Sequence, residues 1–138
     1  MYLLSKSKAM TLLTGMLLLV FIIHIGVLLQ WIPYENVWAG KINSVEEMYV
    51  YEAISLLLNG VLLLIVYLKK KSIARTSTPI IDTILWIYVV IFGLNSIGNM
   101  FAVTLFEKLF GTLFTLTAMY LCWVIVRKST TSVEDRVL

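Results

Sequence analysis

The sequence is poor in charge, cysteine and histidine, and each shortage excludes a class of protein. Of its 138 residues only 14% are charged, and it has one cysteine, Cys122, and one histidine, His24. One cysteine cannot form an intramolecular disulfide or a Cys-X-X-Cys redox centre, and one histidine leaves too few ligands for a structural zinc site. Phosphate-binding glycine loops, dinucleotide fingerprints and HExxH zinc motifs are also missing. We therefore expect no metal and no cofactor.

Apolar residues, by contrast, are in excess. They make up 60% of the chain, and the mean hydropathy is +0.93. Soluble domains are about half apolar and about one-quarter charged, and one of this size buries only about two-thirds of the surface that its unfolded chain exposes. The composition therefore predicts an integral membrane protein, whose first partner is the lipid bilayer. It excludes a soluble enzyme, a disordered chain and a compact nucleic-acid-binding domain.

Four apolar stretches are long enough to cross a bilayer as helices, which takes about 20 residues. They cover residues 9–31, 49–68, 80–103 and 109–126. Pro33 is expected to stop the first helix, and a run of three lysines, Lys69 to Lys71, follows the second stretch. We predict an all-α fold, a bundle of four transmembrane helices that forms a single domain over residues 1–138.

The lysine and arginine residues indicate how the chain is oriented. With four spans, the N-terminus, the middle loop and the C-terminal tail lie on one side, and nine of the 11 basic residues fall there. These nine are Lys6, Lys8, Lys69, Lys70, Lys71, Arg75, Arg127, Lys128 and Arg136. Because cytoplasmic loops carry the excess of Lys and Arg, we predict that both termini are cytoplasmic. The expected location is the cell (inner) membrane.

Polar side chains inside the spans are the candidate functional residues, because each costs free energy unless it is paired or hydrated. At about 1.5 Å of rise per residue, His24, Glu52 and Asn95 lie at similar heights in the outer half of the bilayer. Asn59 is seven residues from Glu52, and Asn99 is four residues from Asn95, so each pair shares one helix face. If these faces point inward, they form a polar pocket that opens to the outside.

The outer loop, residues 32–45, is short and rich in aromatic and apolar residues. We expect it either to fold over the outer mouth with Trp38 packed down as a lid, or to anchor the chain at the membrane interface. Ser44, followed by two acids, predicts an N-cap for the second span. The candidate ligand-binding residues are His24, Glu52, Asn59, Asn95, Asn99, Trp31 and Trp38. We assign no catalytic residue.

Each candidate also has a purely structural interpretation. His24 is then a neutral imidazole bonded to a neighbouring amide, and the asparagines are hydrogen bonds between helices. Glu52 is then hydrated at the interface or paired with Lys41. Asp82 lies in the first turn of the third span, where the helix dipole favours an acid, and Cys122 is a small packing residue.

Three runs of the sequence carry a resemblance to a family. They are His24…Ile32-Pro33-Tyr34…Val37-Trp38-Ala39-Gly40, Glu47-Met48-Tyr49…Glu52…Ser55…Asn59 and Leu94-Asn95…Gly98-Asn99…Phe101-Ala102…Phe106-Glu107-Lys108. They resemble a group of small four-span bacterial membrane proteins over most of the chain, which implies the fold and no activity. In layout the chain is also similar to the EXPERA superfamily (emopamil-binding protein and the sigma-2 receptor), whose four-helix bundles place acids and amides around a membrane-embedded pocket. That similarity implies a lipophilic ligand and transfers no residue role.

The leading functional hypothesis is the binding of a small lipophilic or amphipathic ligand in the polar pocket. The alternative is an accessory or assembly subunit of a membrane complex, whose polar residues only lock its own helices together. A membrane protein partner or a second copy of the chain is then the expected partner. Two further alternatives use His24 or Glu52 for proton transfer, in a lipid isomerase or hydrolase or in a small proton-linked transporter.

Overall fold

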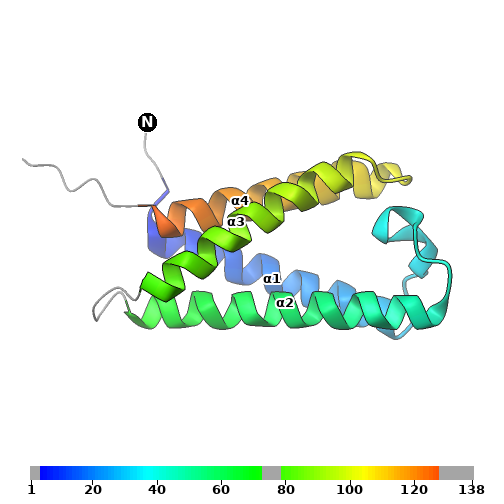
Figure 1. The fold of residues 1–138 in the computed structure, drawn as a ribbon, viewed down its shortest axis with the longest axis horizontal. Coiled ribbons are helices and arrows are strands. Elements are labelled where there is room, and N and C mark those ends of the chain that lie inside the picture. The colour runs from blue at the N-terminus through cyan, green and yellow to red at the C-terminus, as the bar shows by residue number, and fades with distance from the viewer. Residues whose placement is uncertain (1–3, 73–78, 128–138) are drawn as a thin grey trace, which may run out of the picture.

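The computed structural model describes residues 4–72 and 79–127, and within these ranges it is helical with no strand. Its long helices are α1 (Lys6–Leu28), α2 (Val45–Ser72), α3 (Pro79–Met100) and α4 (Thr112–Val126) (Figure 1). Two short 3₁₀ turns, η1 (Tyr34–Asn36) and η2 (Trp38–Gly40), lie between α1 and α2, and a π-helical turn, η3 (Glu107–Gly111), leads into α4. The basic residues Arg75, Lys128 and Arg136 lie outside the described residues.

The predicted membrane-spanning helices are present. Counting η3 with α4, the described residues contain four helices of 20 to 27 residues that are long and apolar enough to cross a membrane. The structure is therefore a small all-α protein with the length and composition of a four-span membrane protein. The ends of the helices differ from the predicted spans, and local hydrogen bonding explains the differences at α1 and α2.

Helix α1 ends at Leu28, before the proline that is expected to stop it. Gln30 adopts a left-handed backbone conformation with φ of +57°. The Gly26 carbonyl accepts the amide of Trp31 at 2.9 Å, and the Val27 carbonyl accepts the amide of Gln30 at 2.9 Å. This pattern, a Schellman motif, closes a helix by satisfying its last carbonyl groups. Trp31 consequently lies beyond the helix, although the predicted span includes it.

Helix α2 begins at the predicted cap. The Ser44 hydroxyl accepts the amide of Glu47 at 3.2 Å, and the Glu47 carboxylate accepts the amide of Asn43 at 2.9 Å. This reciprocal pairing is close to a capping box and satisfies two amides at the start of the helix. The helix then continues past the apolar stretch through Lys69 to Lys71, because lysine is a good helix former and cations are favourable in the last turn.

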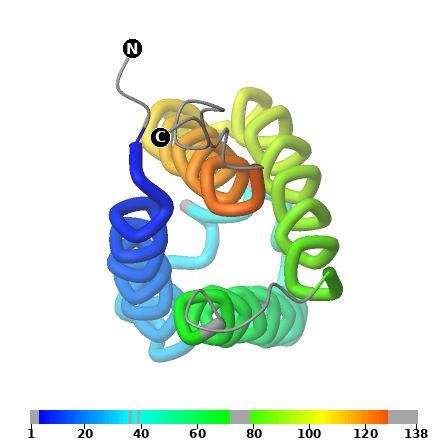
Figure 2. The backbone as a smooth tube through the Cα atoms, turned by 90° about the vertical axis from the view of Figure 1, so that its left-hand side faces the viewer, coloured from blue at the N-terminus to red at the C-terminus, as the bar shows by residue number. Residues whose placement is uncertain are grey.

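The four helices form a bundle in which α1 and α3 each lie beside both α2 and α4 (Figure 2). Of these four interfaces, the one between α3 and α4 is the largest and the one between α2 and α3 is the smallest. The α1–α2 and α3–α4 hairpins are close where α2 ends and α3 begins, and they diverge toward the loop that contains η1 and η2 (Figure 1). We call the first end, with Lys69 to Lys71, the lysine end. The opposite end, with residues 29–44 and 101–106, is the loop end.

The divergence divides the apolar interior into two clusters. The larger cluster lies toward the lysine end and contains buried side chains from all four long helices, including Leu13, Leu62, Leu85 and Leu121. The smaller cluster lies at the loop end, with Val27, Ile42 and Met48 as its buried members. Every residue of the smaller cluster comes from α1, α2 or the loop between them. The loop therefore packs on the first hairpin.

Polar contacts between helices reinforce the lysine half. The Lys69 Nζ on α2 lies 2.5 Å from the Asp82 Oδ1 on α3, and the Lys69 side chain is only 8% exposed. Farther along α3, the Tyr88 hydroxyl donates to the carbonyl of Leu58 on α2 at 2.7 Å. The sequence predicts Asp82 only as an acid favoured by the helix dipole. The structure shows that Asp82 also holds α3 against α2.

Replacing Asp82 by asparagine is expected to lower the free energy of unfolding by about 1–3 kcal/mol, because the shielded Lys69 ammonium loses its paired carboxylate. Thermal unfolding of the purified protein in mild detergent measures this change. The control is Glu35→Gln, which removes an exposed carboxylate and is expected to leave the unfolding temperature unchanged. An Asp82→Asn variant as stable as this control would show that the ion pair adds no stability.

Candidate functional site

The loop end contains a buried carboxylate. Glu52, near the start of α2, is 1% exposed. Its Oε2 lies 2.5 Å from the Nδ1 of His24, and its Oε1 accepts the indole N–H of Trp38 at 2.8 Å. We call these three residues the Glu52 triad. They are three of the candidates chosen from the sequence, and they come from α1, α2 and η2.

Helical spacing explains why Glu52 points inward. Met48, four residues earlier, is fully buried, and Ser55, three residues later, is 8% exposed, so this face of α2 lies against the rest of the protein. Helix α1 runs antiparallel beside α2, which brings His24 to the height of Glu52. The structural alternative of a hydrated Glu52 or a Lys41 pair does not describe the structure, because His24 and Trp38 occupy the carboxylate.

Trp38 is held in a strained backbone conformation. Its φ of +58° lies in the left-handed region, which bulky side chains avoid, and such conformations cost about 1–3 kcal/mol. The hydrogen bond to Glu52 offsets this cost, as does the packing of the indole against Tyr51, with ring centroids 5.1 Å apart. Trp38 also packs in the loop-end apolar cluster. The side chain therefore points down onto α2, as the lid interpretation of the loop predicts.

Gly40 brings the loop close to the second hairpin. Its φ is +65°, and the position of a Cβ on Gly40 would lie 3.4 Å from a methyl group of Val103. Glycine adopts such a φ without strain. The loop that carries Trp38 thus touches the turn between α3 and η3, and it lies between the two hairpins where they diverge (Figure 1).

The hydrogen bonds determine which atoms of the triad remain available. An ionised carboxylate can only accept, so with Glu52 charged, His24 donates from Nδ1. Its Nε2 is then an acceptor if the imidazole is neutral and a donor if the imidazole is protonated. The His24 side chain is 17% exposed, and none of the residues that the structure describes bonds to its Nε2. A carboxylate offers about four lone-pair sites, of which His24 and Trp38 use two. The pair is therefore suited to bind a hydroxyl or cationic group, or to exchange a proton with it.

Three other candidates lie outside the triad. Asn59 donates to the carbonyl of Ser55 in its own helix at 2.8 Å, and Trp31 is 78% exposed. Asn95 is also exposed, although it is seven residues from Tyr88 and so on the same face of α3. Tyr88 reaches α2, whereas the same face two turns later has diverged from α2. Asn95 therefore makes no hydrogen bond to His24 within the described residues, and its place in a shared ligand pocket stays a prediction.

Asn99 belongs to a second polar cluster, between α3 and α4. The Ser96 hydroxyl donates to the Thr115 hydroxyl at 2.8 Å, and Asn99 Nδ2 lies 3.5 Å from the same oxygen. A Cβ on Gly111 would lie 3.0 Å from Asn99 Nδ2, so glycine gives Asn99 room beside α4. The sequence signal for this cluster was the three-residue spacing of Ser96 and Asn99. Asn99 thus has the interhelical role given by its structural interpretation.

A metal site would need several acidic, histidine or cysteine side chains close together. Within residues 4–72 and 79–127, no three or more His, Cys, Asp or Glu side chains are grouped so that they could hold a metal ion. The Glu52 triad itself consists of one carboxylate, one imidazole and one indole.

Comparisons of the chain with protein-family models, with curated proteins and with solved structures found no match. The family resemblance stated from the sequence therefore stays a prediction. The part that the structure supports is coarser: a small protein with four helices long and apolar enough to span a membrane.

Trp38→Phe is expected to lower the free energy of unfolding by about 1.5–3 kcal/mol, because it removes a hydrogen bond to a buried carboxylate and keeps an aromatic ring. Unfolding in detergent by heat or denaturant measures the effect. The matched control is Trp31→Phe, since the Trp31 side chain is largely exposed and its loss is expected to change little. Equal effects of the two substitutions would contradict the role given to the Trp38 indole.

Proposed function

We propose that this chain is a multi-pass protein of a bacterial cytoplasmic (inner) membrane, and that its loop end faces outward and binds a small lipophilic or amphipathic molecule. The charges support this orientation. Basic residues gather at the lysine end (Lys6, Lys8, Lys69, Lys70, Lys71 and Arg127), and acidic residues gather at the loop end (Glu35, Glu46 and Glu47). The positive-inside rule then puts the lysine end and both termini in the cytoplasm.

The observation that carries the binding proposal is the buried carboxylate of Glu52. Ionisable residues inside membrane spans are costly and typically mark sites of function. A buried ion pair adds less stability than apolar side chains of the same volume often would, so the His24–Glu52 pair is a poor choice for stability alone. The strained backbone of Trp38 adds to the cost, and strain of this kind concentrates at functional sites.

Further polar residues of α2 and α3 support the binding proposal. Ser55 and Asn59 continue the inward face of α2 below Glu52, and Asn95 lies on the α3 face that has moved away from α2. In our proposal the ligand lies beside the Glu52 triad, and the Asn95 amide is a further polar contact. Binding sites for small molecules combine apolar walls with a few polar groups in this way.

The chemistry of the triad favours a ligand with one hydroxyl or cationic nitrogen on a lipophilic body. Such a group bonds to Glu52 or to the free nitrogen of His24, while the apolar body lies among the side chains of the spans. The layout similarity to the EXPERA superfamily agrees with this ligand class. In our proposal, Trp38 covers the carboxylate and sets how far a ligand approaches it.

A second function is favoured by the occupation of both Glu52 oxygens within the chain. In that case the triad only fastens the loop to the first hairpin, and the protein is an accessory or assembly subunit with a membrane protein partner or a second copy of itself. The isomerase, hydrolase and transporter hypotheses use the same His24–Glu52 pair. These three hypotheses require a reaction or a transport path in addition to binding. They therefore rank below the ligand-binding and accessory functions.

Native mass spectrometry of the purified protein tests the proposal. Wild type and Glu35→Gln are expected to retain a small-molecule adduct, and Glu52→Gln is expected to retain about tenfold less, since losing a charge-assisted hydrogen bond of about 1.5 kcal/mol weakens binding by that factor. His24→Gln gives a second test if Glu52→Gln is unstable. No adduct on any variant, with Glu52→Gln merely easier to unfold, would support the accessory function instead.

A further inference from the structure

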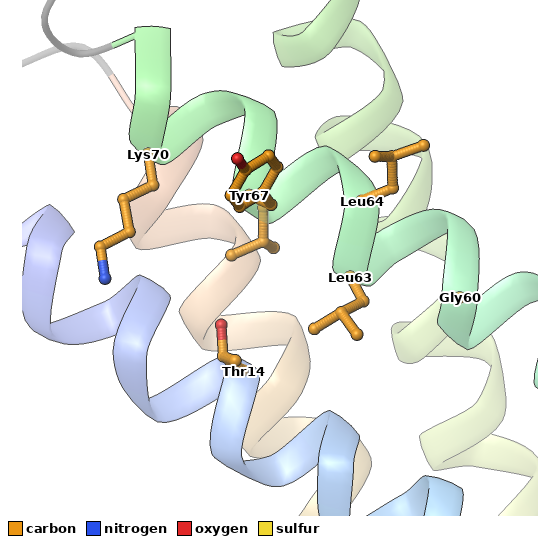
Figure 3. A pocket seen from close by; sticks show the side chains of 7 residues that line it. Thr14, Gly60, Leu63, Leu64, Tyr67 and Lys70 are labelled. Carbon is orange, nitrogen blue, oxygen red and sulfur yellow. The ribbon is translucent and has the colours of Figure 1, made fainter.

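A groove between α1 and α2 in the lysine half is separate from the Glu52 triad (Figure 3). Its volume is about 470 Å³, within the range of about 300–1,000 Å³ that is typical of small-molecule sites. Thr14 of α1 and six residues of α2, from Gly60 to Lys70, line it. Leu64 and Tyr67 in this lining are 55% and 61% exposed, so the groove opens on the outer surface of the bundle, which faces lipid in a membrane.

The length of the groove matches one leaflet of a bilayer. Gly60 and Lys70 are ten residues apart along α2, which is about 15 Å of helix rise, or half of a hydrocarbon core about 30 Å thick. Lys70 lies at the lysine end and Gly60 near the middle of α2. The groove therefore runs from the membrane surface to about the bilayer centre.

The inner part of the groove is apolar, and Gly60 lies close to α1 there. Gly60 contributes no side chain, and the nearest atom to the position of its missing Cβ is the Cζ of Phe21 on α1, at 3.6 Å. Leu63, Leu64 and Val66 form the wall between this point and Tyr67. These side chains suit a hydrocarbon chain and offer it no hydrogen bond.

The mouth of the groove is basic. The exposed Lys70 extends from α2 toward α1 (Figure 3). Two ion pairs of the described residues are His24–Glu52 and Lys69–Asp82. Within residues 4–72 and 79–127, no carboxylate pairs with the Lys70 ammonium. The Tyr67 side chain lies beside it in the lining and supplies a hydroxyl. Basic pockets between transmembrane helices bind the headgroups of anionic lipids.

We propose that this groove binds one anionic phospholipid, with an acyl chain along Gly60, Leu63 and Leu64 and the headgroup phosphate on Lys70. An apolar groove one leaflet long that ends at a lysine fits a phospholipid better than a soluble anion, because a soluble anion has no apolar chain to place in the groove. An anionic lipid is favoured over a zwitterionic one, because Lys71 and the lysines at the start of α1 add positive potential at the same end. The site is independent of the proposed function of the Glu52 triad.

The test is native mass spectrometry of the full chain in detergent with equal amounts of phosphatidylglycerol and phosphatidylcholine that carry identical acyl chains. Wild type is expected to retain phosphatidylglycerol preferentially. Lys70→Gln is expected to lower that retention about fivefold, from the loss of one cation near the headgroup. Lys71→Gln is the matched control, because it removes the same charge one residue away from a side chain outside the groove lining. Leu64→Trp, which fills the groove, is expected to lower retention of both lipids.

Several results would overturn the proposal. Equal retention of the two lipids by wild type would remove the preference for an anionic headgroup. An equal loss in Lys71→Gln and Lys70→Gln would indicate attraction to the whole lysine end, without a defined site. Unchanged retention in Leu64→Trp, or displacement of the lipid by excess inorganic phosphate, would show that the apolar groove holds no acyl chain. Glu52→Gln is expected to leave lipid retention unchanged, so failure here is distinguishable from failure of the proposed function.

Discussion

The carboxylate of Glu52 joins three segments that are far apart in the chain. It receives the imidazole of His24 from α1 and the indole of Trp38 from η2, and it is itself fixed on the inward face of α2. The other packing at the loop end is a small apolar cluster to which α3 and α4 contribute no side chain. The left-handed backbone of Trp38 persists because its indole is held by the hydrogen bond to Glu52 and by packing against Tyr51. This buried acceptor and the apolar cluster together hold the loop on the first hairpin.

The two halves of the bundle have different physical characters. Toward the lysine end, all four long helices share one apolar cluster, and the Lys69–Asp82 pair joins α2 to α3. Toward the loop end, the hairpins diverge (Figure 1), and polar groups replace apolar contacts between helices, as Ser96 and Thr115 do. The half of the bundle with the larger shared apolar cluster thus adjoins the half that contains the buried carboxylate and the strained Trp38 backbone. The groove between α1 and α2 that is proposed to bind a phospholipid lies on the outer surface of the lysine half.

Several features were predictable because they depend on the chain's own local pattern. Hydropathy located the four long apolar helices, and the antiparallel α1–α2 hairpin made the height estimate for His24 and Glu52 valid. The same estimate does not determine how far Asn95 lies from His24, because the distance between α2 and α3 is set by packing at the far end of the bundle and leaves no local signal. The left-handed φ of Gln30, which ends α1 early, was also unpredictable, since glycine is the residue expected there. The pairing of Lys69 with Asp82 was also unpredictable, because the partner of a long lysine side chain depends on how the helices pack.

Hydrogen exchange of wild type and Glu52→Gln, followed by mass spectrometry of peptides, tests most directly whether this carboxylate holds the loop end. The account predicts faster exchange of amides in residues 33–44 of the variant, and unchanged exchange in the lysine half of α1 and α4, where the larger apolar cluster is intact. It would be contradicted by unchanged exchange in the loop. Uniformly faster exchange over the whole chain would equally contradict it, because Glu52 would then support the bundle as a whole.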